Sequence, residues 1–155
     1  MSDGSVQIGL RRPMRSLEIA ASGLSAQRTR MDTIAMNIAN AESIGADGAP
    51  YRRRVVRLEP VPFRPLLEGG PAEPVDAGDE GAGGVRVAGI EEDPSEGQLI
   101  YDPSHPDADA DGYVHMPNVS ITEEMVDLME ARRLFDANAS VFEAIKGMLR
   151  RATQL

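Results

Sequence analysis

The sequence predicts an α+β fold in which two long terminal α-helices pack as a coiled-coil-like pair and a small β-rich insert lies between them. Apolar residues recur at helical spacing near both ends of the chain, whereas β-forming residues and turn signals fill the middle. Residues 65–124 contain one Lys or Arg and fifteen Asp or Glu, whereas residues 1–64 contain ten and six and residues 125–155 contain five and four. The middle is therefore strongly acidic and the two ends are close to neutral.

The composition narrows the class of protein further. At 155 residues the chain has the length of one domain, or of one domain with a modest insert. Only 4% of residues are aromatic and Trp is absent, which favours aliphatic helix faces over the ring-rich core of a compact enzyme. The net charge of −9 argues against nucleic-acid binding. The absence of Cys excludes disulfides, thiol catalysis and zinc–thiolate sites.

We expect three parts in the chain. Residues 1–13 form a flexible N-terminal lead-in, and residues 14–45 and 118–155 form a discontinuous helical core. Residues 46–117 form a β-rich inserted domain with a mobile Gly-, Pro- and acid-rich loop at residues 66–84. No apolar run approaches the roughly 20 residues of a membrane span, and no cleavable signal peptide is visible, so we expect no membrane insertion.

The first helix is expected over residues 14–40. Apolar residues at alternating steps of four and three form a narrow stripe of the kind that packs on another helix. The stripe consists of Leu17, Ala21, Leu24, Met31, Ala35 and Ile38, with Arg28 at the one skipped position, and it is widened on one side by Ala20, Gln27 and Ile34. Gly23 is a mild defect that costs about 1 kcal/mol relative to Ala, and it lets a neighbouring backbone approach closely.

The second helix is expected over residues 120–151, with Ser120 or Thr122 as its N-cap. Glu123 and Glu124 lie at the favourable end of the helix dipole. Apolar residues recur at every seventh position: Leu128, Phe135, Phe142 and Leu149, with Leu134, Val141 and Met148 beside them and Ile145 between. Such stripes fit either a hairpin within the chain or helices that have partners in other subunits, and the pattern alone does not decide between them.

Four short β segments are expected between the helices. They are bounded by turn signals at Asp93–Pro94 and Asp102–Pro103. The segments are residues 51–63, 85–90, 98–101 and 112–116.

The stretch DADADG at residues 107–112 resembles the opening of an EF-hand calcium loop. The first three ligand positions and the turn glycine are filled by Asp107, Asp109, Asp111 and Gly112. The last position, which needs a bidentate Glu, is Asn118, whose amide lacks the charge. We therefore expect an acidic surface turn, and we keep a small calcium-binding module built on the Asp-rich loop 107–118 as the alternative function.

Three further patterns could each form a binding or catalytic site, and each also has a simpler structural explanation. The run of arginines at residues 52–54 allows a nucleic-acid patch, although one short run in an acidic chain is better explained as a subunit contact or a solvated strand. His105 and His115, with aspartates between them, allow a metal site or simple turn residues. Asp107 and Asp109 imitate a general acid–base pair, but no apolar pocket or nucleophile accompanies them. We expect no enzyme, no cofactor and no metal.

Residues 21–43, ASGLSAQRTRMDTIAMNIANAES, resemble the signature of the bacterial flagellar axial proteins, which comprise the rod, hook and hook-associated subunits. The motifs that carry the resemblance are residues 22–27, 30–31 and 37–41. It continues at residues 51–53, where the rod subunits have their first strand, and residues 85–148 look closely like the rod proteins. The resemblance covers about residues 14–155 except loop 66–84.

The resemblance implies a structural subunit of the proximal rod of the flagellar basal body, which assembles into a hollow helical tube that transmits torque and passes exported subunits. The implied partners are other copies of the chain, other rod subunits, the adaptor between the rod base and the MS ring, and the flagellar export apparatus. The implied location is the basal body in the periplasmic space, after export without a cleaved signal peptide.

The resemblance also implies that both terminal helices contact neighbouring subunits. The subunit-interface residues that we expect are Leu17, Leu24, Met31, Ile34, Asn37, Ile38, Asn40, Met125, Leu128, Phe135, Asn138, Val141, Phe142 and Leu149. The three asparagines in this set either fix the register of the helices through hydrogen bonds or face solvent. The methionines at helical spacing are interpreted as adaptable filler of a core or an interface.

Overall fold

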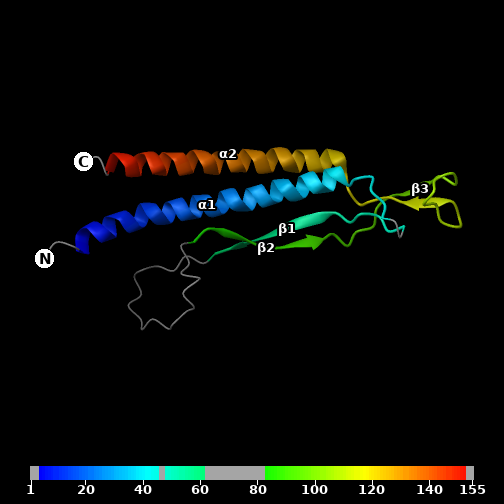
Figure 1. The fold of residues 1–155 in the computed structure, drawn as a ribbon, viewed down its shortest axis with the longest axis horizontal. Coiled ribbons are helices and arrows are strands. Elements are labelled where there is room, and N and C mark those ends of the chain that lie inside the picture. The colour runs from blue at the N-terminus through cyan, green and yellow to red at the C-terminus, as the bar shows by residue number, and fades with distance from the viewer. Residues whose placement is uncertain (1–3, 46–47, 62–82, 153–155) are drawn as a thin grey trace, which may run out of the picture. The chain divides into compact units, whose positions relative to one another are not determined.

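The structure, a computed structural model, describes residues 4–45, 48–61 and 83–152 of the chain (Figure 1). The elements follow in the order α1 (Gly4–Ala39), β1 (Arg54–Pro60), β2 (Val85–Glu92), β3 (Leu99–Tyr101), β4 (Tyr113–His115) and α2 (Ile121–Ala152). This order confirms the predicted α+β class. Most of the predicted loop 66–84 and the start of the predicted lead-in lie outside the described residues.

Helix α1 is 36 residues long and begins at Gly4, within the predicted lead-in. The start expected at residue 14 is therefore wrong, although proline has no N–H to donate to the preceding turn. The helix instead continues through Pro13 and accommodates the missing hydrogen bond. At its other end, the backbone N–H of Asn40 donates to the carbonyl oxygens of Met36 and Asn37, and the helix ends at Ala39.

Helix α2 begins one residue after Ser120, which is its N-cap. The Oγ atom of Ser120 accepts a hydrogen bond from the backbone N–H of Glu123 at 3.5 Å, in the Ser-x-x-Glu arrangement of a capping box. Carboxylates in the first turn and Arg150 and Arg151 in the last turn complement the helix dipole. No helix in the described part of the chain is long and apolar enough to cross a membrane.

The strands form two separate two-stranded sheets, β1–β2 and β3–β4, and each strand overlaps a predicted segment. Backbone hydrogen bonds from Val61 to Gly84 and from Asp93 to Arg53 give β1 and β2 opposite directions. The β3–β4 pair is antiparallel, and it places Leu99 opposite His115, Ile100 opposite Val114 and Tyr101 opposite Tyr113.

The chain divides into two compact units, each of which contains part of both helices. Unit 1 comprises Met1–Gln27, Leu58–Val87 and Leu134–Leu155, and unit 2 comprises Arg28–Arg57 and Ala88–Arg133.

Within unit 2 the helix segments run antiparallel. Arg30 of α1 forms ion pairs with Asp127 and Glu130 of α2, whereas Asn37, about two turns further along α1, is bonded to Glu124 in the first turn of α2. The residue numbers therefore rise along one helix as they fall along the other.

The buried apolar side chains of the described residues are mostly small. They are Ala20, Ala26 and Ile145 in unit 1, and Ile34, Ala41, Val114 and Ala131 in unit 2. The largest side chains that are fully buried are polar, namely Asn37 and Glu124. Since a charged side chain is rarely buried unless it is paired, Glu124 indicates a paired polar network at the centre of unit 2.

Candidate functional site

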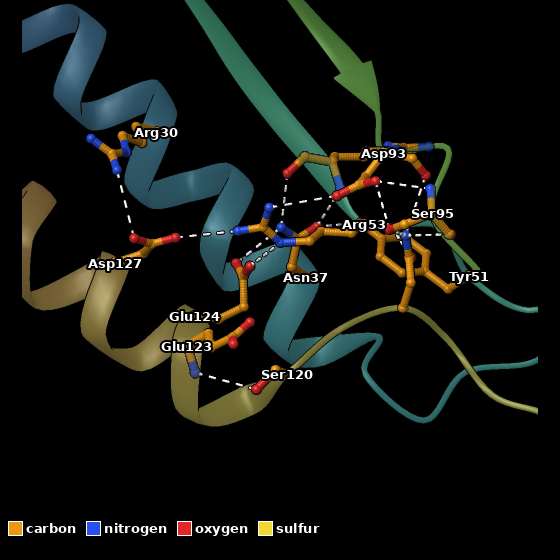
Figure 2. Close-up of polar contacts among 12 residues, drawn as sticks. Arg30, Asn37, Tyr51, Arg53, Asp93, Ser95, Ser120, Glu123, Glu124 and Asp127 are labelled. Atoms are coloured by element: carbon orange, nitrogen blue, oxygen red, sulfur yellow. Dashed lines mark hydrogen bonds and ion pairs between the residues drawn. The ribbon is translucent and has the colours of Figure 1, made fainter. Parts of the chain in front are cut away.

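A polar network occupies the buried centre of unit 2, where the end of α1, the start of β1 and the first turn of α2 meet (Figure 2). Its three central side chains are Asn37, Arg53 and Glu124. Asn37 lies in the signature motif at residues 37–41, and Arg53 lies in the motif at residues 51–53. Two parts of the sequence signature therefore converge on one point in space.

Glu124 has no solvent-exposed surface. Its Oε1 atom accepts a hydrogen bond from Nε of Arg53, and its Oε2 atom accepts one from Nδ2 of Asn37 at 3.0 Å. A buried carboxylate without such partners would be strongly destabilising. Both carboxylate oxygens are therefore hydrogen-bonded. One bond comes from Arg53, which directly precedes β1, and the other comes from Asn37 on α1.

The Asn37 amide uses its full hydrogen-bonding capacity. Its Nδ2 atom donates to Glu124 and to the carbonyl oxygen of Arg54 at 2.8 Å. Its Oδ1 atom accepts from the hydroxyl of Tyr51 at 3.0 Å and from the backbone N–H of Arg54 at 2.9 Å. An amide side chain offers two donors and two lone pairs, so all four positions are used. Of the two roles considered for Asn37, the cross-helix hydrogen bond is the one present.

Arg53 connects the network to further carboxylates. Its Nη2 atom lies 3.2 Å from Oδ2 of Asp127, and its Nη1 atom lies 3.9 Å from Oδ2 of Asp93. Burial alone would lower the pKa of the Arg53 guanidinium, but the hydrogen bond to Glu124 and the charges of Glu124, Asp127 and Asp93 outweigh it and raise that pKa. Arg53 is therefore held as a cation by all three acidic neighbours.

Tyr51 contributes an uncharged hydroxyl to the network. Burial raises the pKa of its hydroxyl, and the carboxylates of Glu124 and Glu92 add to this effect while the Arg54 cation opposes it. The Arg54 guanidinium carbon also lies 5.8 Å from the centre of the Tyr51 ring, within the range of a cation–π contact. The hydroxyl thus remains a hydrogen-bond donor to Asn37.

Asn118 fastens the segment before α2 to the insert. Its Oδ1 atom accepts from the backbone N–H of Arg53 at 2.7 Å, and its Nδ2 atom donates to the carbonyl oxygens of Asp93 and Ser95 at 3.2 and 2.9 Å. The hydroxyl and N–H of Ser95 donate to Oδ1 of Asp93, which, together with the Arg53 cation, lowers the pKa of that carboxyl. Asn118 occupies the last position of the EF-hand pattern, where its amide cannot replace Glu. In the structure its side chain instead links three backbone segments by hydrogen bonds.

This arrangement favours a structural clamp over catalysis. A groove of about 520 Å³ lies beside the network, but three of its four charged lining residues, Arg53, Asp93 and Asp127, are already paired with one another, and the fourth is Glu123. Among the described residues, no group of three or more His, Cys, Asp or Glu side chains is arranged to hold a metal ion. The network joins three distant segments of the chain and leaves no charged group of its centre unpaired.

The DADADG stretch forms a turn that its own carboxylates stabilise. The Oδ1 atom of Asp109 accepts hydrogen bonds from the backbone N–H groups of Asp111 and Tyr113 at 2.9 and 2.8 Å. Gly112 has a φ of 82°, a left-handed conformation that favours glycine. The same pattern occurs at Asp102, where the hydroxyl and N–H of Ser104 lower the pKa of the carboxyl. These contacts agree with the acidic surface turn and give no support to the calcium module.

Comparison with known proteins decides the family. Residues 17–46 match the family described as Flagella basal body rod protein, and residues 110–155 match the family described as Flagellar basal body rod FlgEFG protein C-terminal. The flagellar basal-body rod protein FlgC of Borreliella burgdorferi is 47% identical over 143 residues, which cover 88% of this chain and 93% of that protein. This chain belongs to the FlgC family of flagellar basal-body rod proteins. FlgC of Bacillus subtilis is 41% identical over 147 residues, covering 90% and 95% of the two chains, and FlgC of Salmonella typhimurium is 40% identical over 134 residues, covering 85% and 89%.

Membership of the FlgC family confirms the resemblance drawn from the motifs. The chain is a structural rod subunit of the flagellar basal body and not an enzyme. The polar network then has a structural interpretation, since it fixes the insert of an FlgC-family subunit to both of its helices.

The subunit-interface residues predicted for this FlgC-family chain divide by their burial within the single chain. Ile34 and Asn37 are buried, and Met125 and Val141 are exposed. The remainder are half-buried: Leu17, Leu24, Met31, Ile38, Asn40, Leu128, Phe135, Asn138, Phe142 and Leu149. Among the methionines, Met36, Met129 and Met148 are also exposed, so these three do not fill the core of the single chain.

The other two asparagines differ from Asn37. Nδ2 of Asn40 donates to the carbonyl oxygen of Met36 in its own helix at 2.8 Å. Asn138 lies beside Gly23 in unit 1, where a Cβ atom on the glycine would be 2.9 Å from the Asn138 Nδ2 atom. The close neighbour expected at Gly23 is therefore present, but it is a side chain and not a backbone.

Sequence reasoning missed Glu124, Tyr51 and Asn118 as members of a site. One signal was available for Glu124: together with Leu128, Ala131 and Phe135 it follows the steps of four and three that mark the packed face of α2. A charged residue at a packed position requires a partner of opposite charge. The motif at residues 51–53 contains such a partner, Arg53.

Proposed function

We propose that this FlgC-family chain forms part of the proximal rod, where it assembles with copies of itself and with other rod subunits into a hollow helical tube that transmits torque and passes exported subunits. The observation that carries the proposal is the large apolar surface that the helices of the single chain leave exposed. The exposed large apolar residues on the two helices are Ile19, Met36, Ile121, Met125, Val126, Met129, Val141 and Met148. Apolar surface of this kind on a structural protein fits contacts with other subunits.

In this proposal the heptad stripe of α2 and the stripe of α1 form a coiled-coil-like pair that continues into neighbouring subunits. The half-buried and exposed members of the predicted interface set supply the contact. Because such an assembly is helical, one face of a subunit meets a different face of the next. Ile34 and Asn37 act from inside the chain by fixing the helix faces that neighbours meet.

In this proposal the two predicted domains occupy different positions in the tube. Residues 14–45 and 118–155 form the helical core along the inner wall of the tube, and the insert, residues 46–117, lies outside. The hydrogen bonds of Asn37 and Asn118 support this division, since they anchor the insert to both ends of the core. The acidic charge of residues 65–124 keeps the insert soluble before assembly.

We also propose that the chain crosses the flagellar export apparatus unfolded, without a cleaved signal peptide, and joins the rod in the periplasmic space next to the adaptor at the MS ring. The absence of Cys supports this route, because a chain without thiols cannot form wrong disulfides in an oxidising compartment.

The experiment that tests this function is replacement of FlgC in Bacillus subtilis by this chain, followed by a swimming assay and by electron microscopy of isolated basal bodies. The chain should restore rods and swimming. A variant with Val141→Glu and Met148→Glu, at two exposed positions of α2, should be produced and folded but should build no rod. The control is Asp111→Asn, an exposed change outside the helices, which should behave as the unmodified chain. Restoration by the double variant, or absence of the unmodified chain from basal bodies, would contradict the proposal.

A further inference from the structure

A groove of about 460 Å³ opens at the surface of unit 2, between the segment after α1, the segment around β3 and the start of α2. Two exposed apolar side chains line it, Ile100 (45% exposed) and Ile121 (44% exposed), together with the more buried Met116. Apolar surface that stays open in a single chain is available to a partner.

The same groove carries three exposed carboxylates, those of Glu42, Glu96 and Glu123. None of them forms an ion pair with any described residue, and no Lys or Arg lines this groove. Arg52 lines an adjoining cavity together with Glu96. We call this surface the acidic groove. Its chemistry calls for a partner that combines apolar side chains with positive charge.

A surface with that chemistry lies on α2 of the same unit. Met125, Val126 and Met129 are 55%, 56% and 66% exposed, and Arg132 and Arg133 follow one turn later. These five residues share one side of the helix, because positions three, four, seven and eight apart lie close together on a helix surface. Neither arginine forms an ion pair within the described parts of the chain. We call this surface the Met–Arg stripe.

We propose that the Met–Arg stripe of one copy of the chain docks in the acidic groove of a second copy. Two guanidinium groups would meet three carboxylates, and the two methionines would cover Ile100 and Ile121. The groove and the stripe consist of different residues, so in a heterologous assembly this contact can repeat from copy to copy. This inference rests on the proposed function and names one contact of the assembly.

The test uses the full chain, which has no native Cys to interfere. One copy carries Met129→Cys and a second carries Ile100→Cys, and the mixture is oxidised and separated without reductant. The expected result is a disulfide-linked heterodimer, several-fold more abundant than with the control pair, in which Ile90→Cys replaces Ile100→Cys. Ile90 is 52% exposed on β2 and lies outside the groove, so it matches Ile100 in residue type and exposure.

Charge exchange between the copies makes the test specific. Arg132→Glu and Arg133→Glu on the Met129→Cys copy should reduce the heterodimer to the control level. Glu42→Lys and Glu96→Lys on the Ile100→Cys copy should then restore it, since the two surfaces would again carry opposite charges. Asp32→Lys and Asp111→Lys, at two exposed carboxylates outside the groove, should not restore it.

The inference is overturned if the heterodimer does not exceed the control pair, if charge exchange has no effect, or if Met129→Cys links to itself as efficiently as to Ile100→Cys. Its failure is distinguishable from failure of the proposed function. If the link is absent while the chain still builds rods, the docking contact alone is wrong. If the link forms and responds to charge while no rods are built, the rod proposal alone is wrong.

Discussion

Asn37 and Glu124 are the two largest fully buried side chains of the described residues, and they are hydrogen-bonded to each other across α1 and α2 at 3.0 Å. Each needs the other, because a buried amide donor and a buried carboxylate are both costly without a partner. The pair also depends on one alignment of the helices. A slide of either helix by one turn would separate the two groups and leave Oε2 of Glu124 without its donor.

Glu124→Gln should lower the free energy of unfolding by about 2–3 kcal/mol. Both oxygens of Glu124 accept hydrogen bonds, so the new amide would direct its own N–H₂ group at the donor of either Arg53 or Asn37. Urea unfolding followed by circular dichroism measures the effect. The matched control is Glu123→Gln in the same turn, whose exposed side chain forms no ion pair with the described residues; it should change stability by less than about 0.5 kcal/mol. Equal effects of the two substitutions would mean that the buried pair is not stabilising.

Asn37→Ala should cost about 2–3 kcal/mol, because it leaves the Tyr51 hydroxyl and both backbone polar groups of Arg54 without their partner. Asn40→Ala should cost less than about 1 kcal/mol, since the Asn40 side chain is partly exposed and, among the described residues, bonds only to a carbonyl of its own helix. Thermal unfolding of the two variants side by side checks this order. A larger loss of stability in Asn40→Ala than in Asn37→Ala would contradict the central role assigned to the hydrogen bonds of Asn37.

Most of the fold was predictable because its elements are encoded by local patterns, although α1 begins at Gly4 and not at residue 14. The apolar repeat of α2 predicted a helix over residues 120–151, and the structure has Ile121–Ala152. The network was not predictable in the same way. Glu123 and Glu124 are adjacent and identical, and both suit a helix N-terminus, yet one is exposed and the other has no exposed surface. What separates them is the approach of Arg53, which is 71 residues away in sequence. Long-range pairing of this kind leaves little trace in local spacing.

Gly147→Ala should stabilise the chain by about 1 kcal/mol, because alanine is a better helix former and a new Cβ at this position meets nothing within 4 Å. Gly23→Ala should give no such gain. Its Cβ would lie 2.9 Å from Nδ2 of Asn138, so the side chain on α2 would have to move. Adding Asn138→Ala should recover the helix-propensity gain in a double-mutant cycle of thermal unfolding. If Gly23→Ala alone stabilises as much as Gly147→Ala, the helices are not in close contact at this point.

Asp109→Ala should lower stability by about 1 kcal/mol, and by the same amount with calcium as with a chelator present. The substitution removes the acceptor for the N–H groups of Asp111 and Tyr113, which belong to the turn itself. Asp111→Ala is the control, since the backbone and not the side chain of Asp111 takes part in these bonds. A rise in melting temperature on adding calcium that disappears in Asp109→Ala would support an ion site and contradict the turn.

Ser95→Ala should change the response of the chain to acid. The hydroxyl and N–H of Ser95, with the Arg53 cation, hold the pKa of Asp93 below its ordinary value of about 3.9. A carboxyl whose pKa is lowered in the folded state contributes stability that is fully present above the unfolded pKa and is lost as the pH falls through the folded pKa. Removing the hydroxyl moves the folded pKa back toward the ordinary value and shrinks that contribution. The difference in melting temperature between the unmodified chain and Ser95→Ala should therefore be largest near neutral pH and should narrow below about pH 4.

Ser140→Ala is the matched control for this pH dependence. Its hydroxyl donates to the backbone carbonyl of Asp136 at 2.9 Å and not to a carboxylate, so its effect on melting temperature should not vary with pH. Melting curves of the three proteins at several pH values between neutral and acid make the comparison. A gap for Ser95→Ala that stays constant or widens on acidification would mean that Ser95 does not lower the pKa of the Asp93 carboxyl.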